Sequence, residues 1–188
     1  MNRSLHGMSE NDVMRFEPPL AGNEIEAVLG SLERLRATFA WKCGGLDADS
    51  MNRTVGASTM TLGGLVKHLA AVESIHFSRV FDTRPGMPWE AVDWDADPDW
   101  PWHSAVGDTP EELMTLWLEA TDRSRGVVAK ALVEGGMDLL SVPRGPSGAS
   151  VNLRRVLMDL VEEYGRHVGH ADLIRESVDG LVGEDPPG

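Results

Sequence analysis

The stretch EEYGRHVGHADLIRE, residues 162–176, decides the fold because it carries the core pattern of one long helix together with unusual polar residues. Apolar residues recur in and around it at intervals that alternate between four and three, the spacing of one buried face of an α-helix. His167 occupies a place on this face where a core hydrophobe is expected. The apolar positions of the face are Leu153, Leu157, Leu160, Tyr164, Ala171, Ile174 and Val178.

Glu163, His167 and His170 follow one another along this helix at offsets of four and three residues. Since each residue turns an α-helix by about 100°, their carboxylate and imidazole groups can converge on one point. Ionisable groups in an apolar interior need partners, and a divalent cation would satisfy all three. The alternatives are ordinary surface residues or an intrahelical Glu–His pair. One helix cannot complete a metal site, so a further ligand must come from elsewhere in the chain.

A second amphipathic segment, STMTLGGLVKHLAAVESIHFSRVF at residues 58–81, offers two candidates for that ligand. His76 continues its apolar stripe, and His68 lies at the margin of the stripe. Either imidazole can therefore point inward, and position alone slightly favours His76. The alternative for each is a core histidine that is hydrogen-bonded to a neighbour. The stripe itself consists of Leu62, Leu65, Leu69 and Val72.

Two separated motifs, TLGGLVKHLAAVE at residues 61–73 and EEYGRHVGHADLIRE, with WKCGGLD ahead of the first, resemble the DinB-like four-helix-bundle superfamily. The resemblance is to its actinobacterial branch, related to mycothiol-dependent maleylpyruvate isomerase, and it covers about residues 23–180. It implies an all-α, up-down-down-up four-helix bundle with long crossover loops. In this superfamily a divalent metal is bound by one ligand from the second helix and two, one turn apart, from the last.

Carried over residue by residue, the resemblance implies that the metal ligands are His68, Glu163 and His167, and it favours His68 over His76. This His, Glu, His set resembles the isomerase-type variant, and zinc or nickel fits its nitrogen and oxygen donors. Many relatives have glutamine where this chain has His170. We predict that His170 is the catalytic acid or base, and a fourth ligand or a hydrogen-bonding partner of a ligand are the alternatives.

The resemblance further implies an enzyme that activates a thiolate at a divalent metal, as a thiol S-transferase or isomerase with mycothiol as cosubstrate. A bound cation would lower the pKa of the thiol and present the thiolate to an electrophile. Two alternatives remain open: a metal-dependent hydrolase that uses bound hydroxide, and a non-catalytic metal-binding bundle that forms a homodimer. The sequence does not specify the electrophile.

The composition is that expected of one cytoplasmic domain. The chain has 188 residues, 41% of them hydrophobic, which suits a single core. It has no apolar run long enough to cross a membrane, and its first residues lack the apolar core of a signal peptide. The formal charge of −13 argues against binding to nucleic acid. The single Cys43 excludes an internal disulfide and is expected to pack at a helix end.

Start and stop signals predict four long helices within a bundle at residues 23–180, flanked by loosely held ends at residues 1–22 and 181–188. The connection at residues 83–108 contains four of the six tryptophans, which argues against disorder. We expect it to pack across the bundle, either as a partial lid over the metal or as an anchored crossover. The predicted helix starts are Asn23, Ser58 or Thr59, Thr109, and Ser150 or Asn152.

Overall fold

The computed structural model describes residues 17–81, 83–143 and 148–184. The regular secondary structure of this part of the chain is helical, without a strand, as predicted. Its long helices are α1 (Glu24–Cys43), α3 (Leu62–Ser78), α5 (Pro110–Glu134) and α6 (Leu153–Asp179). The shorter elements are α2 (Ala48–Met51), α4 (Trp100–Ser104) and the 3-10 turns η1 (Trp89–Ala91), η2 (Ala105–Gly107) and η3 (Gly136–Asp138). The predicted loose ends lie largely outside the described residues.

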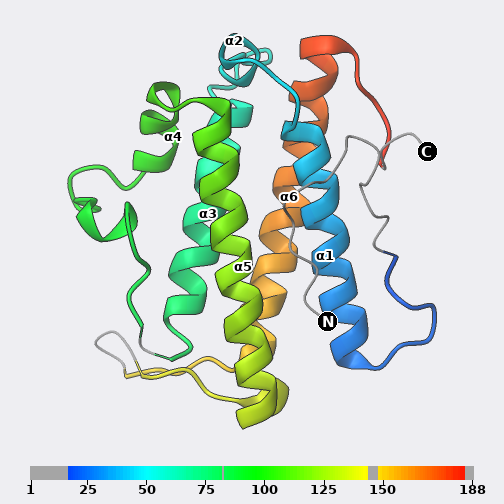
Figure 1. Cartoon of the computed structure of the whole chain (residues 1–188), viewed down its shortest axis with the longest axis vertical. Helices are drawn as coiled ribbons and strands as arrows, with labels where there is room; N and C mark the ends of the chain where they lie inside the picture. Colours follow the sequence, from blue (N-terminus) through cyan, green and yellow to red (C-terminus); the bar gives the residue numbers. More distant parts are fainter. Residues whose placement is uncertain (1–16, 82, 144–147, 185–188) are drawn as a thin grey trace.

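The four long helices lie side by side as two pairs (Figure 1). Helix α1 packs on α6 and α3 packs on α5, and the pairs meet mainly where α3 contacts α6. In Figure 1, α1 and α6 run in one direction along the bundle, and α3 and α5 run in the other. None of the helices in the described part has the length and apolar content needed to cross a lipid bilayer. The contact between α3 and α6 joins the two sequence motifs in space.

Local capping chemistry fixes the starts of the helices. At α1, the Glu26 amide donates to Asn23 Oδ1 over 3.1 Å and the Asn23 amide donates to Glu26 Oε2 over 2.9 Å, which is the predicted capping box. Thr109 and Asn152 cap α5 and α6 as predicted. The start of α3 was predicted two or three residues too early, at Ser58 or Thr59, because the amide of Gly64 donates to Thr61 Oγ1 and makes Thr61 the N-cap.

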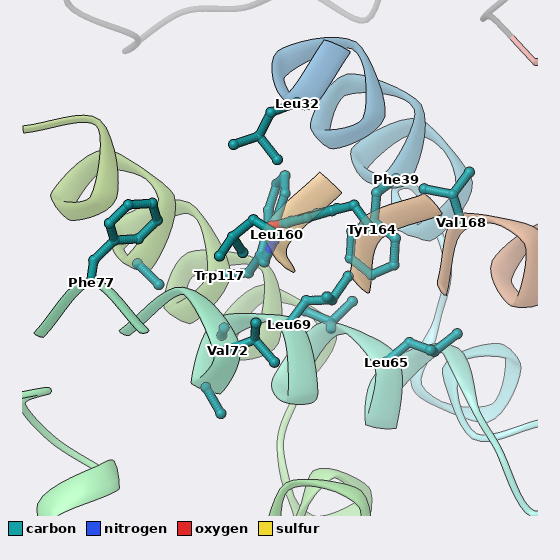
Figure 2. Close-up of a cluster of buried hydrophobic side chains, with 14 of the residues drawn as sticks. Leu32, Phe39, Leu65, Leu69, Val72, Phe77, Trp117, Leu160, Tyr164 and Val168 are labelled. Carbon is teal, nitrogen blue, oxygen red and sulfur yellow. The ribbon is translucent and has the colours of Figure 1, made fainter. Parts of the chain in front are cut away.

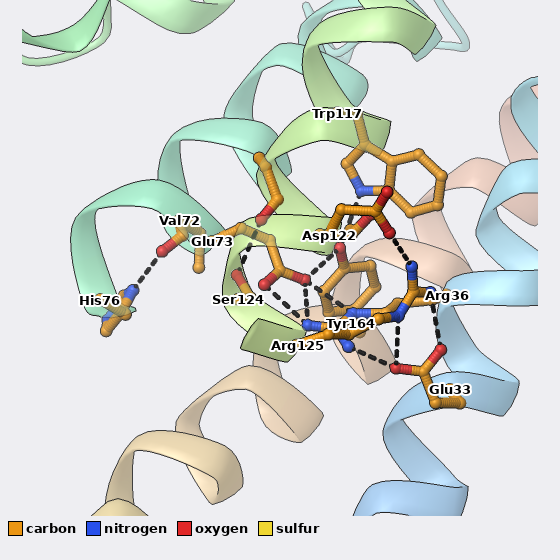
Figure 3. Close-up of polar contacts among 12 residues, drawn as sticks. Glu33, Arg36, Val72, Glu73, His76, Trp117, Asp122, Ser124, Arg125 and Tyr164 are labelled. Carbon is orange, nitrogen blue, oxygen red and sulfur yellow. Dashed lines mark hydrogen bonds and ion pairs between the residues drawn. The ribbon is translucent and has the colours of Figure 1, made fainter. Parts of the chain in front are cut away.

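The core between the helices is apolar, with large side chains from all four long helices in contact (Figure 2). A polar network crosses this core (Figure 3). Arg36 of α1 donates from Nε and Nη2 to the two carboxylate oxygens of Glu73 on α3, over 2.8 and 2.7 Å. The Tyr164 hydroxyl of α6 donates to Glu73 Oε1, and Trp117 Nε1 of α5 donates to that hydroxyl, each over 2.8 Å. One hydrogen-bonded network therefore joins all four long helices.

The crossover between α3 and α5 packs against the outward face of α3 through its tryptophans, beside the bundle in Figure 1. Trp89 is fully buried, and Trp94, Trp100 and Trp102 are half-buried. The ammonium of buried Lys67 lies 4.4 Å from the centre of the Trp100 ring and forms an ion pair with Asp108. These contacts tie the crossover to α3 next to the metal motif.

Candidate metal centre

The contact between α3 and α6 brings His68, Glu163 and His167 together. Nε2 of His68 lies 3.4 Å from Glu163 Oε2, and Nε2 of His167 lies 3.3 Å from the same oxygen. One potential ligand atom from each residue falls within 4.8 Å of the other two. Glu163 and His167 share a face because they are four residues apart on one helix, whereas His68 reaches them only through tertiary packing.

The donor set suits a divalent cation. Two imidazole nitrogens and one carboxylate oxygen are ligands that zinc and nickel accept, and three protein ligands leave coordination positions for other molecules. The site lies at the edge of the core, since the side chain of His167 is 8% exposed, that of His68 23% and that of Glu163 36%. A small molecule can therefore approach the ligands from the side of Glu163.

Both imidazoles are held in the neutral form that binds metals. Burial lowers the pKa of His167 to about 4, and the neighbouring His68 acts in the same direction while the Glu163 carboxylate opposes it. Burial also lowers the pKa of His68, again against the effect of Glu163. Neutral rings at neutral pH have a lone pair available for a cation without first losing a proton.

We expect the metal-free protein to lose stability on acidification partly through His167. Its pKa is about 4 in the folded chain, against an ordinary value of 6.5, so between these values the unfolded chain binds more protons. The contribution of His167 to stability is complete above its ordinary pKa of 6.5, and it is lost progressively as the pH falls through the folded pKa of about 4. Urea unfolding of the metal-free protein at about pH 7 and about pH 5 measures this loss. A His167→Gln protein should lose less stability between these two pH values. An equal loss in both proteins would contradict the assignment of this pH dependence to His167.

His170 lies beside the ligand set but outside it. Its Nδ1 is 3.3 Å from Nδ1 of His167, whose Nε2 faces Glu163. In the described part of the chain the candidate metal group comprises His68, Glu163 and His167 only. The geometry allows His167 to donate its Nδ1 hydrogen to His170 and to keep its Nε2 lone pair for a cation. Among the roles that the sequence left open for His170, this contact is compatible with a hydrogen-bonding partner of a ligand.

His76, the other candidate on α3, is not in the ligand group. Its Nδ1 donates to the backbone carbonyl of Val72 over 2.9 Å, one turn earlier in the same helix (Figure 3). It lies two turns from His68 along α3. The structure thus brings together the residues that the family resemblance implied, and not the histidine that position on the apolar stripe slightly favoured.

Trp102 of α4 contacts the site, and sequence reasoning did not single it out. Its ring stacks on His68 with centroids 4.7 Å apart and an interplanar angle of 23°, and it lies 5.9 Å from the ring of His167. Gly64 makes this approach possible, since a Cβ there would lie 2.8 Å from Cε3 of Trp102. The number of tryptophans in the crossover was a signal, but it did not show which one reaches the ligands. Trp102 covers one side of both imidazoles.

Cys43 has no part in this arrangement. It is the last residue of α1, it is 2% exposed, and burial raises the pKa of its thiol well above the ordinary range. Such a thiol stays protonated and unreactive at neutral pH. The expectation that Cys43 packs at a helix end is confirmed.

The structure has the features that the DinB-like resemblance implied, an all-α bundle with two imidazoles and a carboxylate grouped between its second and last long helices. The family model of the mycothiol S-transferases matches residues 27–180. This match covers most of the chain, so the protein belongs to the mycothiol S-transferase family, as the sequence motifs indicated. No curated protein matches the chain.

Proposed function

We propose that the protein is a metal-dependent S-transferase that joins the thiol of mycothiol to a small electrophile. The observation that supports this most directly is the group of three ligand atoms within 4.8 Å of one another at an accessible edge of the core. A divalent cation, zinc or nickel, held by His68, Glu163 and His167 would lower the pKa of a bound thiol and so supply a thiolate near neutral pH. Family membership supports mycothiol as that thiol.

The protein residues then have distinct tasks. His68 and His167 supply neutral nitrogens, and Glu163 supplies the single negative charge of the ligand set, which leaves the bound cation with a net positive charge for a thiolate. Trp102 stacks on His68 and keeps water from one side of the site. These features support a site in which the thiol approaches from the side that Trp102 leaves open.

His170 is best explained as a positioning residue. If its Nδ1 accepts a hydrogen bond from His167, its proton lies on Nε2, and it can take up another proton only by giving up that bond. A hydrogen bond to the second nitrogen of a ligand histidine fixes its tautomer and orientation. We therefore propose this role for His170 in place of the acid or base role. The cytoplasmic location and a homodimer stay predictions.

Cobalt substitution tests the proposed chemistry. When mycothiol is added to the cobalt-loaded protein, we expect a sulfur-to-cobalt charge-transfer band, together with metal-dependent conjugation of a model electrophile. The band should be absent from the His68→Ala protein and retained in the His76→Ala protein, which loses a histidine of the same helix outside the ligand group.

The opposite result separates the alternatives. If no small thiol changes the cobalt spectrum while esters or amides are cleaved in a metal-dependent way, the hydrolase reading replaces the transferase. If neither thiols nor esters react and the metal remains bound, the protein is a metal-binding bundle without this activity.

A further inference from the structure

A pocket of about 190 Å³ lies between the outward face of α3 and the crossover. Helix α3 contributes His68, Val72, Ile75 and His76, which follow one another at helical spacing, and the crossover contributes Trp94 and Trp102. His68 and Trp102 also belong to the candidate metal centre. A molecule in the pocket therefore contacts a metal ligand directly, whereas Glu163 and His167 do not line it.

The size and the walls of the pocket fit one aromatic ring. An apolar cavity of about 150 Å³ is known to hold a benzene molecule, so 190 Å³ accommodates a ring with a short substituent. The indoles of Trp94 and Trp102 and the aliphatic side chains of Val72 and Ile75 provide apolar contact surface. Indole faces also attract cations.

Apart from the shared ligand His68 and the indole of Trp102, the polar side chains that line the pocket act as hydrogen-bond acceptors or already use their donor. His76 uses its Nδ1 hydrogen to bond the Val72 carbonyl, so in the neutral ring Nε2 carries a lone pair and no hydrogen. Asp99, at the exposed edge, adds a carboxylate. No lysine or arginine is among the described residues that line the pocket, and the Trp94 indole hydrogen is used by the carbonyl of Trp89.

We infer that this pocket binds the electrophilic cosubstrate, and that the cosubstrate is a small aromatic molecule with a cationic or hydrogen-bond-donating substituent. A carboxylate at the Asp99 end of the pocket would meet the charge of Asp99 and the lone pair of His76, and no lysine or arginine among the described lining residues compensates them. The pocket thus selects against electrophiles that would place a carboxylate beside Asp99. The name cosubstrate rests on the proposed function, but binding to the pocket does not depend on it.

Calorimetry with two probes of the same ring and opposite charge tests this inference without any thiol. Benzylammonium, whose protonated nitrogen has no lone pair for a metal, should bind the zinc-loaded full chain more tightly than benzoate. Asp99→Asn should weaken benzylammonium binding by about threefold to fivefold, the upper part of the range of an exposed charge pair. Asp95→Asn, a change of an exposed carboxylate in the same segment but outside the pocket, should leave it unchanged.

Filling the pocket gives an independent test. Ile75→Trp should weaken benzylammonium binding by more than about tenfold, because the indole occupies the space of the ring. Benzoate that binds through the metal would bind this variant as well as it binds the wild type, which separates that mode from the pocket. The inference is overturned if benzoate binds in the pocket as tightly as benzylammonium does. It is also overturned if Ile75→Trp leaves benzylammonium binding unchanged.

The two proposals fail separately. If the thiolate band is missing while benzylammonium still binds and Ile75→Trp weakens that binding, the transferase proposal is wrong but the pocket is supported as an aromatic-cation site. A thiolate band without benzylammonium binding keeps the transferase and overturns the pocket assignment.

Discussion

The His167→Ala protein is expected to contain almost no divalent metal and to lose thiol-transfer activity. His167 is the most buried of the three proposed ligands, and removing its imidazole leaves two donors and an open volume where water replaces the nitrogen. Elemental analysis should find about one ion per chain in the wild type and almost none in the variant. Far-UV circular dichroism of both proteins checks that the helices are retained. The same metal content in both would show that the proposed site is wrong.

The matched control is His170→Gln, a change one helical turn along α6. The glutamine carbonyl can accept the hydrogen bond from His167, so this variant should keep its metal while activity falls by about tenfold, at the lower end of the effect of altering a ligand's partner. A change in the pH profile is expected with it. If His170→Gln loses metal as completely as His167→Ala does, His170 is a ligand and the three-residue set is incomplete.

Replacing Arg36 with methionine should destabilise the protein by about 3–5 kcal/mol, the cost of breaking a buried ion pair on one side. Arg36 is 3% exposed and Glu73 is fully buried, so the variant leaves a carboxylate in the core whose remaining described partner is the Tyr164 hydroxyl. Urea unfolding followed by circular dichroism measures the change in the free energy of unfolding.

Two further variants make this prediction specific. Arg36→Met combined with Glu73→Gln should recover a large part of the loss, because the uncompensated charge is removed. Arg154→Met removes a guanidinium that also pairs with two carboxylates, those of Glu24 and Asp138, but at the surface, and it should cost much less. Equal losses from Arg36→Met and Arg154→Met would contradict a special role for the buried network.

Much of the fold could be predicted from the sequence because it depends on local signals. The capping boxes at Asn23 and Thr109 and the left-handed Gly180 at the end of α6 need only neighbouring residues. The start of α3 was misplaced because Ser58 and Thr61 are both good N-caps, and Ser58 instead accepts a bond from the Met60 amide in the preceding turn.

The candidate site could likewise be predicted only where it depends on local sequence. Glu163 and His167 could be paired from sequence because one turn of a helix separates them. The choice between His68 and His76 depends on how α3 meets α6, which no local pattern contains, and only the family resemblance pointed to His68. Trp102 could not be chosen among the tryptophans of the crossover, since its contact with His68 depends on the path of a long irregular segment and on the space left by Gly64.

The network through Tyr164 has a consequence for how the protein would acquire and exchange the proposed metal. Tyr164 directly follows Glu163, and its hydroxyl is fixed by Glu73 and Trp117, so α6 cannot turn about its axis without breaking buried hydrogen bonds. The ligand face of α6 is thus oriented before any ion arrives, and little conformational entropy is lost on binding. In contrast to small zinc domains that fold only around their ion, we expect this bundle to release one metal and take up another while it remains folded.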